Sequence, residues 1–227
     1  MTYTELVDEI QNYTQNYESA FVATIPTFVT QTEERIYNTV QIPPLRKNVT
    51  GVTTAGNKYL SCPNDFLSSF SLAVVDADDN YEYLLNKDVN FMRAAYPKAA
   101  DTGLPRYYSL FGPTVNTGVV TTELSFILAP TPDANYDVEL HYYYYPVSIS
   151  DTVNNPSGTS WLGDNYSPVL LYGSLVEAYT YMKGEQDMMA YYEKKYQDAL
   201  GQLNRLGTGL ERGDAYRDGQ AKIKVMP

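Results

Sequence analysis

The sequence predicts an α+β protein: a helical bundle built from both ends of the chain, an inserted antiparallel β-sandwich or barrel-like module, and an extended C-terminal tail. Apolar residues recur at helical spacing near both ends, short strand-like segments between turn residues fill the middle, and periodicity is lost after residue 206. The chain has 227 residues, 44% of them hydrophobic, which suffices for a sizeable core and excludes a disordered chain.

Residues 1–45 are expected to form two helices. One apolar stripe follows Thr4, a candidate N-cap, and a second follows Thr24 and Pro26, where proline suits the first helical turn. The two stripes comprise Leu6, Val7, Ile10, Tyr13 and Tyr17, and then Phe28, Val29, Thr32, Ile36 and Val40. A Pro-Pro pair at 43–44 ends the segment. Up to that pair, acidic residues outnumber basic ones by six to one, which predicts a strongly negative face.

An antiparallel β module is predicted over residues 46–150, because short strands alternate there with Gly, Pro, Asn and Asp. The predicted strands are 49–54, 58–60, 67–75, 81–85, 106–111, 121–128 and 136–145, with a short helix at 88–95. The last strand has apolar or aromatic residues on both faces, so both faces are expected to be covered. One face carries Val138, Leu140, Tyr142 and Tyr144, and the other carries Glu139, His141, Tyr143 and Tyr145.

Residues 160–206 are predicted to add two helices to the bundle. The first begins at Ser167, the candidate cap before a proline, and is apolar almost all round, which indicates burial on several sides. Its small residues Gly173 and Ala178 allow another helix to approach closely. The second helix has an apolar stripe and ends at Gly207, a candidate C-cap.

Residues 207–227 are predicted to form an extended C-terminal arm. This segment is rich in glycine and lacks helical or strand periodicity. A segment of this kind is expected to become ordered only against a partner.

Two single residues have side chains that are capable of catalysis or metal binding. His141 is the only histidine, and one histidine cannot form a multi-histidine metal site. Cys62 is the only cysteine, which excludes an intrachain disulfide. A nucleophilic thiol needs a base oriented toward it, and no such signature is recognisable, so Cys62 is expected to be a packed thiol.

Three short patterns also fail as sites. The run from Asp76 resembles a calcium loop, but Tyr81 and Lys87 stand where glycine and glutamate are required, so a hairpin turn is predicted. The glycines after residue 206 lack the spacing of a dinucleotide fingerprint. Glu33 and Glu34 are adjacent on a helix and point to different sides, which excludes a paired acid and base. No catalytic, metal-ligating or cofactor-binding residue is therefore predicted, and no cofactor.

Charge and hydropathy limit the partners. The net charge of −11 argues against a stable hold on nucleic acid, which requires clustered Lys and Arg. No apolar stretch approaches the roughly 18 residues of a membrane span, so no membrane partner is expected. The 23 tyrosines, against 7 Phe and 1 Trp, fit protein interfaces, carbohydrate-binding faces or strand surfaces.

Several phrases, in order over residues 1–206, resemble the head-to-tail adaptor (connector) proteins of tailed bacteriophages, the short-tailed ones especially. They are MTYTELVDEIQNY, EERIYNTVQIPPLRK, GLPRYYSLFGP, LSFILAPTPDANYDVELHYYYYPVSI and SWLGDNYSPVLLYGSLVEAYTYMKGEQDMMAYYEKKYQDAL. The resemblance implies a structural virion protein rather than an enzyme. It implies a homo-oligomeric ring, commonly a dodecamer, that joins the portal protein to the tail nozzle or tail tube and extends the DNA channel.

The same resemblance implies a place in the neck of the virion, assembly in the host cytoplasm, and a C-terminal extension that clasps the portal or a neighbouring subunit. DNA would pass the channel without specific binding. Two other interpretations stay open. One is a different neck, collar or tail-tube structural protein, which stoichiometry on the portal would distinguish. The other is a tyrosine-rich glycan-binding module, which a glycan array would test.

Overall fold

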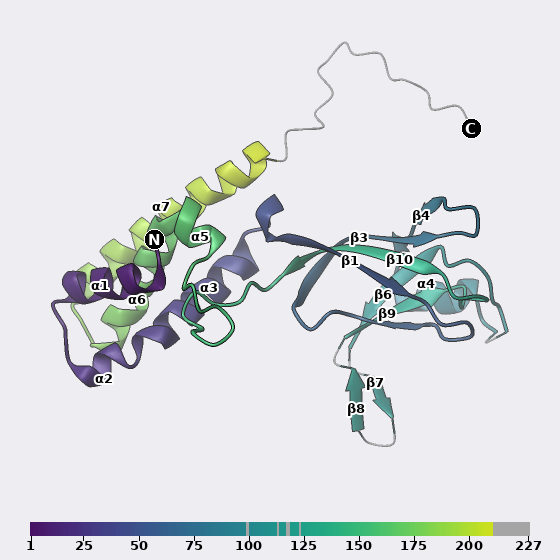
Figure 1. The fold of residues 1–227 in the computed structure, drawn as a ribbon, viewed down its shortest axis with the longest axis horizontal. Helices are drawn as coiled ribbons and strands as arrows, with labels where there is room; N and C mark the ends of the chain where they lie inside the picture. The colour runs from purple at the N-terminus through teal and green to yellow at the C-terminus, as the bar shows by residue number, and fades with distance from the viewer. Residues whose placement is uncertain (99, 113, 117–118, 123, 211–227) are drawn as a thin grey trace, which may run out of the picture. The chain divides into compact units, whose positions relative to one another are not determined.

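The computed structural model describes residues 1–98, 100–112, 114–116, 119–122 and 124–210 (Figure 1). The chain divides into two compact units. Met1–Leu45 and the chain from Pro146 onward form a helical unit, and Arg46–Tyr145 form a β unit. The mixed α+β class predicted from the sequence is confirmed. Each unit has its own buried residues, so each is described by itself.

The helical unit combines segments from both ends of the chain. Its elements are α1 (Tyr3–Thr14), α2 (Ser19–Val22), α3 (Ile25–Thr39), a 3-10 turn η1 (Pro43–Leu45), α5 (Trp161–Asn165), α6 (Ser167–Tyr181) and α7 (Gln186–Leu210). Helix α6 lies at the centre and contacts α1, α3, α5 and α7. This position explains why α6 is apolar almost all round: it buries Val169, Leu170, Leu171, Leu175 and Ala178 against several neighbours.

Two buried glycines allow the helices to approach closely. A Cβ at Gly173 in α6 would overlap Thr32 of α3 and press on the ring of Tyr196 in α7, as the small side chain predicts. A Cβ at Gly207 in α7 would overlap Ile42. The predicted C-cap at Gly207 is therefore wrong, because α7 continues to Leu210 and uses this glycine for packing. The predicted arm cannot begin at residue 207, and residues 211–227 lie outside the described chain.

Of the two helix starts predicted in residues 1–45, the first differs in position and the second does not. Thr2, not Thr4, caps α1: its hydroxyl accepts from the Glu5 backbone N–H at 3.3 Å, and the Glu5 carboxylate accepts from the Thr2 N–H at 2.8 Å. This reciprocal pair satisfies two donors that a helix start leaves open. Thr24 occupies the N-cap of α3, with proline in the first turn, but its side chain makes no capping hydrogen bond.

The predicted cap at Ser167 is wrong as well. Ser167 is the first residue of α6, and Tyr166 occupies the N-cap position without a capping hydrogen bond. The side chain that caps in this region is Ser160, which accepts from the Gly163 N–H at 3.0 Å and starts the short helix α5. A serine followed by proline is typical of a helix start, but the sequence pattern did not reveal the short helix α5 that directly precedes α6.

Within the described residues, the β unit contains two four-stranded sheets and a two-stranded ribbon. The first sheet has the order β1 (Arg46–Val52), β10 (Asp137–Tyr144), β3 (Phe66–Val75), β4 (Tyr81–Tyr83). The second has the order β2 (Tyr59–Ser61), β9 (Ser125–Ala129), β6 (Tyr107–Phe111), β5 (Leu85–Asn86). All pairs are antiparallel except β5 with β6. The barrel-like alternative is wrong, because each of these described sheets is open and ends in two edge strands.

Two predicted strands are divided in the structure. The segment 81–85 forms β4 of the first sheet and β5 of the second, with buried Leu84 between them. The segment 121–128 is shared between β8 (Val119–Thr122) and β9, and β8 pairs with the unpredicted β7 (Thr114–Asn116). The predicted short helix is α4 (Val89–Ala95), whose N-cap Asp88 accepts from the Asn90 N–H at 2.7 Å.

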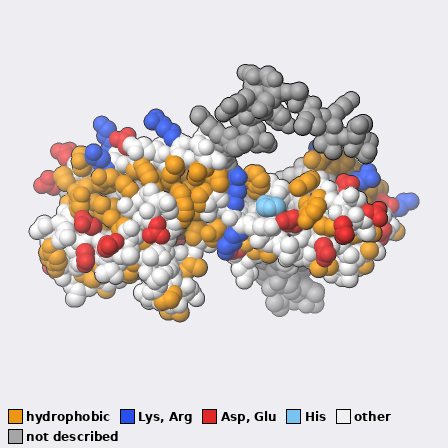
Figure 2. All heavy atoms as spheres, turned by 45° about the horizontal axis from the view of Figure 1, so that its top comes forward, with side chains coloured by type: hydrophobic (Ala, Val, Ile, Leu, Met, Phe, Trp, Pro, Cys, Tyr) orange, Lys and Arg blue, Asp and Glu red, His pale blue; other side chains and the backbone are white. Residues whose placement is uncertain are grey.

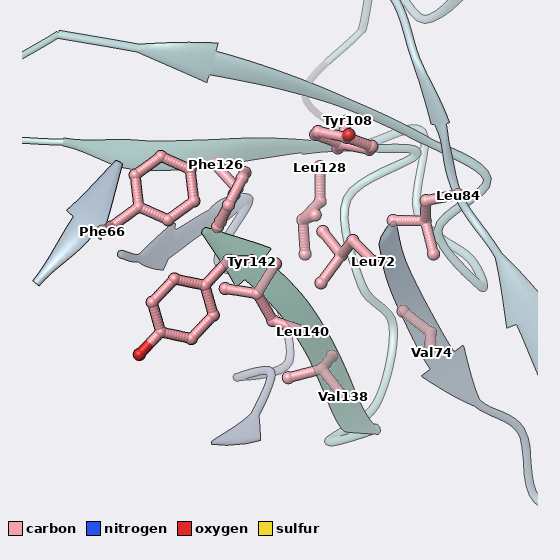
Figure 3. Packing of buried hydrophobic residues seen from close by; sticks show 10 residues of the cluster. All are labelled: Phe66, Leu72, Val74, Leu84, Tyr108, Phe126, Leu128, Val138, Leu140 and Tyr142. Carbon is pink, nitrogen blue, oxygen red and sulfur yellow. The ribbon is translucent and has the colours of Figure 1, made fainter. Parts of the chain in front are cut away.

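Side chains of both sheets share one hydrophobic core (Figure 3). Phe126 of β9 is fully buried, and its ring centre lies 5.5 Å from Phe66 of β3 and 5.6 Å from Tyr108 of β6. The remaining labelled members are Leu72, Val74, Leu84, Leu128, Val138, Leu140 and Tyr142. Strand β10 supplies every second residue to this core, as its alternation predicts. On its other face, Tyr143 is also buried, beneath Arg46 and Phe70.

Candidate functional site and interaction surfaces

His141 lies on the outer face of the first sheet and is half-exposed. Its Nδ1 is 3.2 Å from the Ser71 hydroxyl, and its Nε2 is 3.8 Å from the Glu139 carboxylate. The same carboxylate accepts from the Asn48 side-chain amide across the strand pair. These contacts place the imidazole in a surface hydrogen-bond network on a pleated sheet, beside an acidic side chain (Figure 2). The network orients the histidine, but none of its four residues lines the groove or the pocket described below.

Cys62 follows β2 and is partly buried against the β core. Burial raises the pKa of its thiol to about 12, so the sulfur is protonated at neutral pH. A protonated thiol is a poor nucleophile and a poor metal ligand. The structure therefore fits the packed thiol that the sequence predicts.

Asp76 organises the turn between β3 and β4, and the predicted hairpin is confirmed. Its Oδ1 accepts from the backbone N–H groups of Asp78 and Asn80, each at 2.8 Å. These bonds lower the pKa of the Asp76 carboxyl, the backbone bond from Asn80 contributing most. Asp79 adopts a left-handed conformation with φ of 62°, which aspartate tolerates. The carboxylate thus holds the turn together.

Glu33 and Glu34 diverge as predicted, but Glu33 points inward. It is 2% exposed, and its Oε1 accepts from the Ile149 backbone N–H at 3.0 Å. Burial raises the pKa of this carboxyl to about 6, and hydrogen bonds from Ser148 and Ile149 oppose that rise. Its Oε2 is buried and has no partner within the described chain. One of the six acids expected on a negative surface is therefore a core residue.

Arg35 links three helices across a shallow groove of about 620 Å³. Its guanidinium lies 3.5 Å from the Glu177 carboxylate of α6 and 3.1 Å from that of Glu193 in α7. It also lies 4.5 Å from the ring centre of Tyr196, a cation–π distance. Because Glu34 lines the groove too, acidic groups outnumber the single cation among its described lining residues. Those residues give a polar groove without a nucleophile–base pair.

Tyrosines gather where the ends of α1, α6 and α7 meet. The ring of Tyr192 lies 5.0 Å from Tyr179, 5.4 Å from Tyr191 and 6.4 Å from Tyr13. Burial, chiefly, raises the pKa of Tyr192 to about 12. Around this buried ring, other aromatic side chains are exposed, and Tyr17 is 60% exposed. Figure 2 shows hydrophobic side chains across the viewed face of this unit.

The β unit exposes aromatic side chains as well. Tyr81 and Tyr83 of β4 are 54% and 64% exposed, and Phe70 of β3 is 55% exposed. Phe91 of α4 and Phe111 of β6 are exposed on the second sheet's side of the unit. Scattered exposed apolar residues are ordinary on a protein surface, but large aromatic rings in this number favour contact with other proteins.

The sequence model of the SU10 adaptor protein family matches residues 1–221. The chain belongs to this family. Its members are head-to-tail adaptors of bacteriophages, so the adaptor is a structural virion protein, and its family is not an enzyme class. Membership implies that the adaptor self-associates and contacts other components of the phage neck. A search of curated proteins found no match.

Two findings concern the described part of the adaptor. No group of three or more His, Cys, Asp or Glu side chains there could hold a metal ion. None of the helices in those residues is long and apolar enough to cross a membrane.

The sequence pattern itself indicates that one carboxylate of the adaptor is buried. Glu33 lies four residues after Val29 and three before Ile36, so it falls on the apolar stripe of α3. By contrast, no local signal predicts the Arg35 network, because its partners Glu177 and Glu193 lie more than 140 residues away in the sequence.

Proposed function

We propose that this adaptor forms a closed ring of twelve copies that joins the portal protein to the tail nozzle or tail tube and extends the DNA channel. The observation that carries this proposal is the exposure of large aromatic side chains on both units, with Tyr17 and Tyr83 the most exposed of the described tyrosines. A chain whose family implies self-association needs such surfaces, because tyrosine contributes apolar area and a hydrogen-bonding tip to an interface.

Each of the two units has its own role in this proposal. Helices from residues 1–45 and 160–206 act as one bundle, and residues 46–150 act as a sandwich-like module inserted between them. Residues after 210 serve as the arm that contacts the portal or a neighbouring copy. The adaptor works in the neck of a short-tailed phage and is assembled in the host cytoplasm.

Acidic residues of the helical unit are proposed to face the channel. Glu5, Asp8, Glu18 and Glu34 are acids of the first three helices and their caps, and α1 has no basic residue. Fixed negative charge on a channel wall repels the phosphate backbone, so DNA moves past it without adhering. A structure of the ring with these side chains on its outer wall would contradict this part of the proposal.

The test is the native mass of the purified adaptor, alone and mixed with the portal protein of the same phage. We expect a complex with about twelve adaptor copies on one portal ring. An adaptor that stays monomeric and ignores the portal would contradict it, and a glycan array would then be the next assay. Binding to other neck components but not to the portal would favour a different neck protein.

A matched truncation separates the arm from the ring. A chain that ends at Leu210 keeps every described helix and strand. We expect this chain to keep its fold, measured by circular dichroism, and to bind the portal more weakly than the full chain. Equal portal binding by both chains would remove the arm from the proposal and leave the ring intact.

A further inference from the structure

A pocket of about 420 Å³ opens between α4 and strands β2 and β9 of the β unit. Met92 and Ile127 give it an apolar lining, and Tyr59 and Tyr96 contribute aromatic walls. All of these elements belong to one compact unit, so the pocket does not depend on how the two units are placed. A lining of this kind suits an aromatic or aliphatic side chain of a partner.

The rim of this pocket is basic in an otherwise acidic chain. Lys58, Arg93 and Lys98 line it, against the single carboxylate of Asp101. That carboxylate already accepts from the Lys98 backbone N–H at 3.1 Å. Within the part of the chain that the structure describes, none of the three cations has an ion pair among the salt bridges found. The pocket therefore favours an occupant that carries both carboxylates and an apolar ring.

The hairpin between β3 and β4 has this chemistry. Asp78, Asp79 and Glu82 are exposed at or beside its turn, and no basic residue occurs from Asp76 to Asn86. Tyr83 stands on the same strand and is 64% exposed. The turn is held by the Asp76 hydrogen bonds described above, so its carboxylates are presented on an ordered backbone. Figure 2 shows acidic side chains over this part of the β unit.

The hairpin and the pocket belong to different sheets of the unit. Strand β4 is one edge of the first sheet, whose other edge is β1, and β1 leads directly into β2. The pocket lies over β2 and β9 of the second sheet, and α4 forms its other wall. Ile127 alternates along β9 with the core residues Phe126 and Leu128, so the pocket opens on the face of the second sheet that points away from the first sheet. The hairpin of one copy therefore does not fill its own pocket.

We propose that the pocket receives the β3–β4 hairpin of a second copy of this chain. Tyr83 enters the apolar part, and the carboxylates of Asp78, Asp79 and Glu82 lie against Lys58, Arg93 and Lys98. Each copy then offers a hairpin on its first sheet and a pocket on its second sheet. Such a head-to-tail contact repeats from copy to copy and closes into a ring when the rotation permits. This inference rests on the proposed self-association and names its contact.

Disulfide trapping tests the contact directly. In a Cys62→Ser background, one chain carries Asp79→Cys and another carries Lys98→Cys. We expect a disulfide-linked heterodimer in the mixture, in several-fold higher yield than from a control pair of Lys98→Cys with Asn64→Cys. Asn64 is exposed in the turn between β2 and β3. A yield no higher than that of the control pair overturns the inference, whether or not rings form.

Charge reversal gives an independent measurement. Asp78→Lys/Asp79→Lys/Glu82→Lys and Lys58→Glu/Arg93→Glu/Lys98→Glu each place like charges together, so assembly on the portal should weaken by at least about tenfold. The chain that carries both sets of changes should regain much of that loss. All six side chains are exposed, and thermal melting checks the fold. If the reversed chains assemble like the natural one, the inference fails while the ring proposal stands; if the natural chain forms no ring, the ring proposal itself fails.

Discussion

At the residue scale, Glu33 is the side chain whose environment departs most from its sequence pattern. A carboxylate costs free energy when it leaves water, and only part of that cost is offset by the hydrogen bonds from Ser148 and Ile149. Its second oxygen has no partner within the described chain. Glu33 thus fixes the segment after β10 to helix α3, and its charge weakens the helical unit.

This burial makes the stability depend on pH. The pKa of Glu33 rises from 4.5 to about 6 on folding, so the native state retains its proton over a range where the unfolded state has lost it. The stabilising contribution of the Glu33 proton to the free energy of unfolding is fully present below pH 4.5 and is lost as the pH rises through 6. This rise in the pKa of Glu33 corresponds to about 2 kcal/mol in the free energy of unfolding.

We therefore expect Glu33→Gln to gain stability relative to the natural chain as the pH rises. The difference in free energy of unfolding between the two should grow by about 2 kcal/mol from about pH 4 to about pH 8, measured by urea denaturation. The matched control is Glu34→Gln, because Glu34 is exposed next to it. A pH-independent difference for Glu33→Gln would show that this carboxyl does not have a raised pKa in the folded protein.

At the scale of the elements, the helical unit depends on how closely its helices approach one another. Gly207 lies in the last described turn of α7, and glycine has a lower helix propensity than alanine. The contact with Ile42 accounts for its presence, because a methyl group at this position would overlap that side chain. Gly201 lies in the same helix, and a methyl group there would meet no described atom within 4 Å.

The two glycines give a matched prediction of opposite sign. Gly207→Ala should lower the free energy of unfolding by about 1–3 kcal/mol, because the inserted methyl group forces α7 away from Ile42. Gly201→Ala should raise it by up to about 1 kcal/mol through helix propensity alone. Thermal or urea denaturation measures both. Stabilisation by both substitutions would mean that α7 does not pack against Ile42.

In the β unit, tertiary contacts divide one predicted strand between two sheets. Segment 81–85 has the composition of one strand, yet Leu84 enters the core between two strands that belong to different sheets. The change of sheet places the acidic β3–β4 hairpin at an edge, where its carboxylates and Tyr83 stay in solvent. An edge strand of three residues with charged neighbours also resists unwanted strand pairing.

At the scale of the whole molecule, the balance of charge predicts a low affinity for DNA. The net charge is −11, and the acids of α1 are not balanced by any basic residue in that helix. Affinity for duplex DNA comes mainly from Lys and Arg that displace counterions, so a chain with this balance should let DNA pass. The proposed role as a channel wall requires this behaviour.

We expect no measurable binding of duplex DNA at physiological ionic strength, up to about 100 μM adaptor, in a fluorescence anisotropy titration. A variant with Glu5→Lys, Asp8→Lys and Glu9→Lys should acquire salt-dependent binding, which shows that the assay can detect it. Salt-dependent binding by the natural chain would mean that its few exposed cations form a phosphate-binding surface.

The sequence by itself determined the α+β class, the helical ends, the β-rich middle, the position of α4, the hairpin after Asp76 and the resemblance to phage adaptors. These follow from local periodicity and turn chemistry, which act over a few residues. Only the tertiary structure decided that Gly207 packs against Ile42 and that Glu33 is buried beside Ile149. It also decided that Leu84 lies between strands of two different sheets, and that a basic pocket and an acidic hairpin lie on different sheets. The physical reason is that each of these depends on contacts between segments far apart in the chain, and local pattern carries no information about which segments meet.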